Sequence, residues 1–180
     1  MRNLGILVML LTGIRVGELV TLRNEEVDGT VIRIRRTETR YRDDATGKDV
    51  YEVKDFPKTA AGLRTVVLPP DYAWVAKRLK MQNPFDEYIF YENGKRLTTN
   101  CIRQRMYRVC KQLNIYPKSP HKARKTYGSI LLDNNIDHRF ITDQMGHTDL
   151  LCSEKHYHRN RRNIDRKSQI LGGIPEFQAK

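Results

Sequence analysis

The stretch SEKHYHRN, residues 153–160, places one tyrosine between two histidines, with arginines close behind. The phenol oxygen of Tyr157 is a potential nucleophile, and His156 and His158 are potential metal ligands. A tyrosine in an amphipathic helix, however, is more often a core residue than a catalyst. Tyr157 therefore has three interpretations from its own neighbourhood: a buried aromatic residue, a neighbour of a metal site, or a nucleophile.

A second group of side chains that could do chemistry lies in PHKARKTYGS, residues 120–129. Pro120 is favourable at the start of a helix, and His121 and Arg124, three residues apart, would project from one face of it. Free backbone N–H groups at a helix N-terminus already favour an anion. An imidazole and a guanidinium at that point predict a phosphate clamp, although H-x-x-R alone occurs by chance on many helices.

Two further candidates have the right chemistry but weaker patterns. His147 follows Gly146 in QMGHTD, at a predicted helix end, where a single histidine is more often a cap than a catalyst. Arg15 and Glu18, in IRVGELVTL, are three residues apart and are expected to share one face of a helix.

The elements that must position these residues are predicted by apolar periodicity. The first helix, in LGILVMLLTGI, is too short to span a bilayer, and no longer apolar stretch follows it. Three alternating pieces, TVIRIRR, VYEVKDF and LRTVVLP, are separated by turn-rich stretches and predict a three-stranded antiparallel meander over residues 30–69. A helix around DYAWVAKRLKMQ, a short strand at EYIFYENG and helices from residue 98 onward follow. The fold class is α+β: one mostly helical domain with a small three-stranded antiparallel sheet.

Composition indicates an anionic partner. The chain has 180 residues, with 33 Lys and Arg against 21 Asp and Glu, so its net charge is +12. Nucleic acid is the first candidate partner and an anionic membrane surface the second. Residues 101–127 hold basic residues and no acidic one, which fits a phosphate backbone better than a solvated helix face. The basic residues of this block are Arg103, Arg105, Arg108, Lys111, Lys118, Lys122, Arg124 and Lys125.

The three cysteines are odd in number and lack CxxC spacing, which favours a reducing, intracellular location.

Taken in order, TGIRVGEL, PKTAAGLRTVVLP, PHKARKTYGS, MGHTD and KHYHRN resemble the motifs of the tyrosine recombinases, the phage-integrase family. The resemblance runs from about residue 4 to residue 160. Each motif is weak alone, but five in the right order are hard to reach by chance. The resemblance implies a catalytic domain that cleaves and rejoins double-stranded DNA through a 3′-phosphotyrosyl intermediate, in DNA integration or recombination.

The resemblance also implies the site residues. Tyr157 would attack the phosphate, Lys58 would protonate the leaving 5′-oxygen, and His121 would help Tyr157 lose its proton. The implied catalytic set is Arg15, Lys58, His121, Arg124, His147 and Tyr157, with Glu18 as supporting acid. The expected DNA-binding residues are Arg103, Arg105, Arg108, Lys122, Lys125 and Arg159. No metal or cofactor is expected, because the arginines supply the positive charge.

Family members usually carry an N-terminal core-binding domain as well. We expect residues 1–180 to form the catalytic domain without that domain. The tail, residues 161–180, is expected to pack on its own domain or on a neighbouring subunit. A homo-oligomer, a tetramer on DNA, is expected for the full-length protein.

Other functions remain alternatives at this stage. A basic DNA-binding module without catalysis fits the charge, and a type IB topoisomerase shares the implied active-site chemistry. A metal-dependent nuclease would need an acidic cluster near these motifs, which the sequence lacks. A metal site could draw on four side chains, although the spacing is unlike that of known zinc sites and neighbouring ligands would point to different helix faces. Its ligands would be His147, Cys152, His156 and His158.

Overall fold

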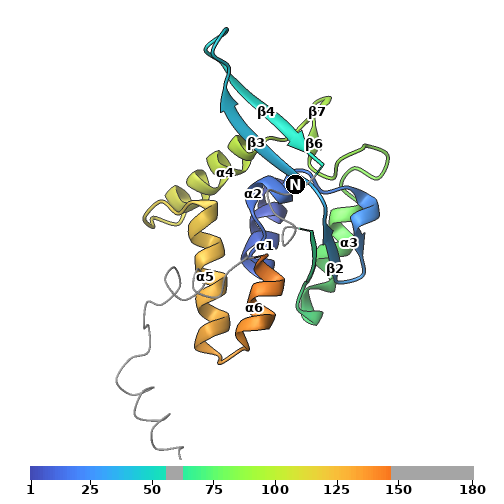
Figure 1. The fold of residues 1–180 in the computed structure, drawn as a ribbon, viewed down its shortest axis with the longest axis vertical. Helices are drawn as coiled ribbons and strands as arrows, with labels where there is room; N and C mark the ends of the chain where they lie inside the picture. Colours follow the sequence, from blue (N-terminus) through green and yellow to red (C-terminus); the bar gives the residue numbers. More distant parts are fainter. Residues whose placement is uncertain (56–62, 147–180) are drawn as a thin grey trace, which may run out of the picture.

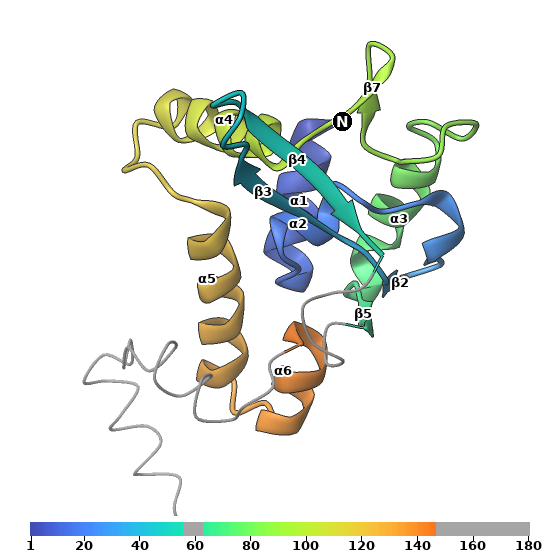
Figure 2. The same cartoon turned by 45° about the horizontal axis from the view of Figure 1, so that its top comes forward.

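Helices supply most of the core in this computed structural model, which describes residues 1–55 and 63–146. Their bounds are α1 Arg2–Thr12, α2 Val16–Leu19, α3 Ala73–Lys80, α4 Thr99–Gln112, α5 Pro120–Asp133 and α6 His138–Met145, with short 3₁₀ turns η1 Asn24–Glu26 and η3 Pro70–Tyr72. Helix α1 lies in the middle, in contact with α2, α3, α4 and α5 (Figures 1 and 2). The predicted apolar first helix is confirmed.

The core forms around α1 because both sides of that helix are apolar. Val8 and Met9 are fully buried in it, and Phe90 fills the space beside Gly5. Other fully buried members come from α2, the sheet, α3 and α4: Leu19, Ile32, Ile34, Leu79 and Ile102. A smaller cluster joins α6 to α5, through Ile141 and Met145 packed against Tyr127.

The strands form three separate antiparallel sheets in the described part of the chain. Their bounds are β1 Val27–Asp28, β2 Val31–Ile34, β3 Thr37–Arg42, β4 Asp49–Lys54, β5 Arg64–Val67, β6 Tyr91–Glu92 and β7 Lys95–Arg96. The order is β1-β2-β5 in a three-stranded sheet, and β3-β4 and β6-β7 are two-stranded. A small three-stranded antiparallel sheet in a mostly helical domain is therefore confirmed.

The predicted meander is wrong in its pairing. Strand β2 pairs directly with β5, with Ile34 opposite Arg64. Strand β4, which begins at Asp49 and ends at Lys54, pairs instead with β3, where the sequence predicted no strand. The turn at Asp43 closes that hairpin, because its carboxylate accepts the N–H groups of Ala45 and Thr46 at 2.8 and 3.0 Å. Alternation predicts that a strand exists but not which strand it meets.

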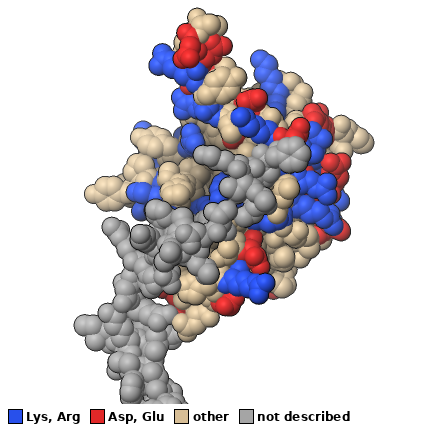
Figure 3. All heavy atoms as spheres, in the orientation of Figure 1, with Lys and Arg blue, Asp and Glu red and all other residues tan. Residues whose placement is uncertain are grey.

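The β3–β4 hairpin projects from the body of the molecule, at the top of Figure 1. Its tip carries basic and acidic side chains side by side (Figure 3). Among them, Arg40 pairs with Asp49 at 2.6 Å. The hairpin is thus a surface of mixed charge, unlike the acid-free block in residues 101–127.

The helices predicted around DYAWVAKRLKMQ and from residue 98 onward are present, but the break between α5 and α6 at residues 134–137 was not predicted. Helix α3 lies within DYAWVAKRLKMQ, Thr98 is the N-cap of α4, and Pro120 is the first residue of α5. The short strand predicted at EYIFYENG is present as β6, which forms a tight hairpin with β7 because Asn93 and Gly94 both have positive φ, as a two-residue turn requires. Within the described residues, every helix falls short of the length and apolar character that crossing a bilayer requires.

Candidate functional site

A cavity of about 380 Å³ lies where the N-terminus of α5 meets the turn between α1 and α2. Its walls are Arg15, Val16, Arg103, Ser119, Pro120, His121 and Arg124. Three residues that the sequence singled out for chemistry, Arg15, His121 and Arg124, thus meet at one place although they come from distant segments. With Arg103, three guanidiniums and an imidazole surround one cavity and form a site for an anion.

His121 and Arg124 reach the cavity because α5 begins at Pro120. The Ser119 hydroxyl caps that helix by accepting the N–H of Lys122 at 3.3 Å, which fixes its first turn. His121 is exposed on that turn, while Arg124 is only 3% exposed. The helix N-terminus adds its own positive dipole to the two side chains.

The guanidinium of Arg124 is held by backbone carbonyls. It donates to the carbonyl of Gly13 at 2.6 Å and to the carbonyl of Met145. Helix α1 is followed by its C-cap residue Gly13, whose φ of 66° is in the left-handed region. The carbonyl of this left-handed C-cap residue is therefore one of the two acceptors of Arg124. A buried guanidinium with fixed carbonyl partners keeps its orientation before any ligand arrives.

Arg15 and Glu18 interact differently from the prediction. Arg15 is the extended N-cap residue of α2 and not part of its face, because Gly13 turns the chain just before it. Glu18 reaches back and accepts the Arg15 backbone N–H and one of its guanidinium N–H groups, both at 2.8 Å. The pair is therefore a capping interaction, with Glu18 1% exposed and Arg15 43% exposed.

Arg64 is a site residue that the sequence analysis missed. Its guanidinium donates to both oxygens of Glu18, at 2.9 and 2.8 Å, and its side chain is only 6% exposed. A signal existed in the sequence: in LRTVVLP, Arg64 alternates with Val66 and Leu68, which are both buried. A basic residue on the inward face of a strand requires a buried acidic partner.

Glu18 is ionised in spite of its burial. Burial alone would raise the pKa of its carboxyl, because the charged form loses its water. The hydrogen bonds and charge of Arg64, the charge of Arg15 and the Arg15 backbone N–H outweigh burial and hold this pKa below its ordinary value. The site therefore keeps one buried negative charge among its arginines.

The last carbonyls of α6 also point at these arginines. Arg64 donates to the Gln144 carbonyl at 2.9 Å and Arg15 to the Gly146 carbonyl at 3.0 Å, and the Arg124 bond to Met145 lies between them. Cations at a helix C-terminus satisfy carbonyls that lack a partner in the helix. The end of α6 is thereby tied to three segments of the site.

Other predicted residues fall elsewhere. Lys58, His147, Tyr157 and Arg159 lie outside the described residues, as do Cys152, His156 and His158. The predicted roles of these residues, and the suggested metal site, therefore stay predictions. Among the described residues, no group of three or more His, Cys, Asp or Glu side chains could hold a metal ion.

The five described DNA-binding candidates separate into groups. Arg103 lines the cavity, and Arg108 and Lys122 are exposed. Arg105 is turned toward α1, where its Nε donates to the Asn3 side chain at 2.6 Å, and Lys125 is half-buried. Arg103 is thus the candidate that structure places at the site.

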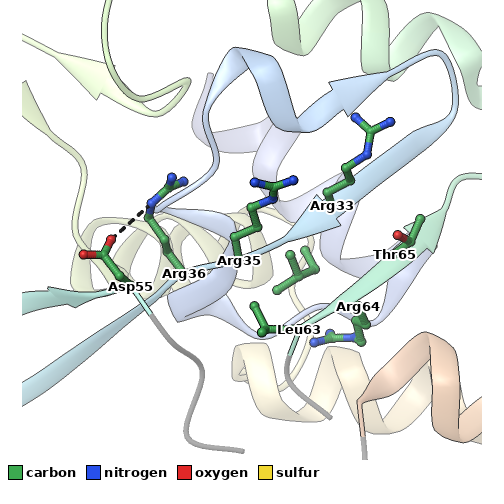
Figure 4. A pocket seen from close by; sticks show the side chains of 8 residues that line it. Arg33, Arg35, Arg36, Asp55, Leu63, Arg64 and Thr65 are labelled. Atoms are coloured by element: carbon green, nitrogen blue, oxygen red, sulfur yellow. Dashed lines mark ion pairs between the residues drawn. The ribbon is translucent and has the colours of Figure 1, made fainter. Parts of the chain in front are cut away.

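A second cavity, of about 630 Å³, lies beside β2 and β5 and shares no lining residue with the first. In Figure 4, Arg33 lies on β2 and Arg35 and Arg36 follow the end of that strand, whereas Arg64 is turned away from them. Arg36 is paired with Asp55 at 3.4 Å. The lining residues are Arg33, Ile34, Arg35, Arg36, Asp55, Leu63, Arg64 and Thr65.

Comparison with protein families and curated proteins gives one consistent result. The model of the phage integrase family matches residues 1–163. A tyrosine recombinase XerD of Chlamydia pneumoniae is 28% identical over 148 residues, which cover 82% of this chain and 44% of that protein. The integrase of Staphylococcus phage L54a is 29% identical over 174 residues, covering 89% of this chain and 48% of the phage protein. The chain spans about half the length of these relatives.

Solved structures share the fold. The Tn1549 transposon integrase in complex with transposon right end DNA has a TM-score of 0.70 at 20% identity, covering 92% of this chain and 56% of the other. The XerA recombinase has a TM-score of 0.67 at 24% identity, with 94% of this chain and 57% of the other covered. The arrangement of helices and sheets described above is therefore a fold shared with these two solved structures.

Proposed function

We propose that this chain, which belongs to the phage integrase family, is the catalytic domain of a site-specific DNA recombinase that cuts and rejoins DNA strands through a 3′-phosphotyrosyl link. The observation that carries the proposal is the meeting of Arg15, His121 and Arg124 at one cavity. All three belong to the catalytic set that the family resemblance implies.

The geometry suits phosphoryl transfer. The transition state at phosphorus carries more negative charge on its non-bridging oxygens than the ground state does, and fixed guanidiniums stabilise that extra charge. Arg124 is held by two carbonyls, and Arg15 by Glu18 and the Gly146 carbonyl. Little reorientation is then required when the charge develops.

The remaining roles rest on the resemblance. The Tyr157 oxygen forms a bond to phosphorus while the bond from phosphorus to the 5′-oxygen breaks. His121 takes the phenol proton, which is needed because a free phenol has a pKa of about 10, and Lys58 gives a proton to the leaving 5′-oxygen. His147 hydrogen-bonds the phosphate. Attack by the 5′-hydroxyl of another strand reverses these steps, so the energy of the phosphodiester bond is kept.

Double-stranded DNA is the proposed partner. The acid-free basic block of residues 101–127 supports it, and so does the solved Tn1549 integrase, a complex with DNA. We assign residues 1–180 to the catalytic domain, with residues 161–180 as a segment that docks on its own domain or on a neighbouring subunit. A tetramer on DNA and an intracellular location belong to the same proposal.

The proposal is tested by covalent trapping on a nicked duplex, in which the strand released by cleavage diffuses away. The duplexes would come from the flanks of the element that encodes the protein, or from a random library. We expect a protein–DNA adduct on a denaturing gel, absent in Tyr157→Phe and unchanged by EDTA.

Two results would contradict the proposal. Cleavage that requires a divalent metal would indicate a nuclease of another class. Salt-sensitive binding without any adduct, even when a core-binding domain is supplied, would indicate a DNA-binding module without catalysis.

A further inference from the structure

Glu18 is the centre of a buried charge network that the phosphate chemistry does not by itself require. Four N–H groups point at its two oxygens: the backbone and side-chain donors of Arg15 and two donors of Arg64, all between 2.8 and 2.9 Å. Each oxygen thus accepts from both arginines. The bonds from Arg64 fix the orientation of the Glu18 carboxylate. That orientation in turn fixes the direction in which the carboxylate accepts the Arg15 guanidinium.

Arg64 and Arg15 are also joined at the end of α6. Arg64 donates to the Gln144 carbonyl, and Arg15 donates to the Gly146 carbonyl two residues later. The side-chain oxygen of Gln144 also accepts the N–H of Val67 at 3.2 Å. This is a second link between the end of α6 and β5, the strand that carries Arg64. Strand β5 thus fixes both acceptors of Arg15, the carboxylate on one side and the helix end on the other.

We infer that Arg64 is a positioning residue, which holds Glu18 and the end of α6 so that Arg15 presents its guanidinium to the cavity. Arg64 does not line that cavity, and its side chain is 6% exposed, so it acts through Glu18 and α6. The catalytic meaning of this role rests on the proposed function, whereas the orientation of Arg15 can be measured without it.

Arginine is required at this position for a geometric reason. A guanidinium offers parallel N–H groups to both carboxylate oxygens and has a further Nε–H on another edge, which here meets the Gln144 carbonyl. A lysine ammonium keeps the charge but is a single point without this planar fork. In the Arg64→Lys variant the lysine charge would still balance the charge of Glu18. It would not fix the orientation of the Glu18 carboxylate.

The test follows the Arg15 side chain directly. Arginine side-chain ¹H–¹⁵N spectra of the DNA-free chain would be recorded for the parent, Arg64→Lys and Arg64→Gln, with the Arg15 signal identified by its loss in Arg15→Lys. In the parent we expect slow rotation and slow proton exchange of the Arg15 guanidinium. In both Arg64 variants we expect faster exchange and averaged signals, and Arg64→Lys should not restore the parent spectrum. Arg78→Gln, on the exposed face of α3, is the matched control and should leave the Arg15 signal unchanged.

Cleavage of the nicked duplex supplies the second reading. We expect both Arg64 variants to form the covalent adduct about 100-fold more slowly, the loss typical of a catalytic group displaced by about 1 Å, with DNA affinity unchanged. An Arg15 signal that stays like the parent's in the folded variants would overturn the inference, whatever happens to cleavage. Failure of the conservative Arg64→Lys to fold, where Arg78→Gln folds, would also overturn it, because Arg64 would then be structural. Absence of cleavage in the parent would instead contradict the proposed function, and the spectra would still decide the role of Arg64.

Discussion

Glu18, Arg64 and Arg124 are charged side chains that are almost fully removed from water, which is costly unless each charge is matched. Glu18 is matched by two guanidiniums, and Arg124 by carbonyls of Gly13 and Met145. Arg15 differs, because 43% of its side chain stays exposed. The three buried side chains are held by fixed partners, and Arg15 is the one of these four that keeps a large exposed fraction.

Glu18→Gln should make the stability difference from the parent depend on pH. The folded pKa of Glu18 lies below its ordinary value of 4.5, so its contribution is complete above that value and is lost as pH falls through the folded pKa. At neutral pH we expect a loss of about 3 kcal/mol, as when one partner of a buried ion pair is removed. The measurement is urea unfolding at a series of pH values.

The control for this prediction is Glu52→Gln, on exposed strand β4, where the pairing with Lys54 is at 3.8 Å. An exposed pair of this kind contributes less than about 1 kcal/mol. A Glu18→Gln difference that stays constant from neutral to acid pH would show that the carboxylate is not ionised in the folded chain.

At the scale of elements, the site is assembled from ends and not from the middles of helices. The left-handed end of α1, the N-cap of α2, the first turn of α5 and the last carbonyls of α6 all meet there. The backbone N–H and C=O groups at helix ends have no partner within the helix, so they can act as donors and acceptors without breaking helical hydrogen bonds. The position of Gly13 decides whether these ends can approach one another.

Gly13→Ala should destabilise the chain more than Gly94→Ala. Both residues have positive φ, 66° and 73°, so both substitutions cost about 1 kcal/mol in backbone strain. A Cβ at Gly13 would in addition overlap the ring of Tyr127, whereas nothing lies within 4 Å at Gly94. We expect an extra loss of about 1–3 kcal/mol, typical of overpacking.

Urea midpoints of the two variants give this comparison, and covalent trapping gives its functional side. Because the Gly13 carbonyl holds Arg124, the Gly13 variant should also cleave DNA more slowly. Equal stability of the two variants would mean that the Tyr127 ring moves aside at little cost.

For the whole molecule, charge is distributed unevenly. The β3–β4 hairpin mixes both signs (Figure 3), and α3 is basic in its last turn. Residues 101–127 are basic throughout, and from this block Arg103 reaches the cavity beside Arg15 and Arg124. Basic side chains of this block are the ones expected to neutralise DNA phosphates and thereby release the counterions condensed on the DNA.

DNA binding should weaken steeply as salt is raised, and Arg103 should account for part of that dependence. Arg103→Gln is expected to reduce the slope of log affinity against log salt by about 0.9, the value for one phosphate contact. Arg78→Gln, on α3, should leave the slope unchanged. Fluorescence anisotropy with a labelled duplex measures both, and equal slopes for the parent and Arg103→Gln would remove Arg103 from the interface.

The sequence by itself determined the family of the protein and predicted which side chains would react. Helical and alternating periodicities are local, so α1, α3, α4 and α5 could be predicted closely from neighbouring residues. The H-x-x-R pair at the start of α5 was also local, because a proline and a cap set the helix start.

Only the tertiary structure decided which distant groups meet. The strand partner of β4 and the bidentate ion pair of Arg64 with Glu18 could not be inferred from the sequences of the segments that they join. Strand partners are chosen by packing and turn closure, and a buried charge is matched wherever the fold brings an opposite one. The alternation in LRTVVLP places Arg64 on the inward face of its strand, but only the fold brings Glu18 and the Gln144 carbonyl to it.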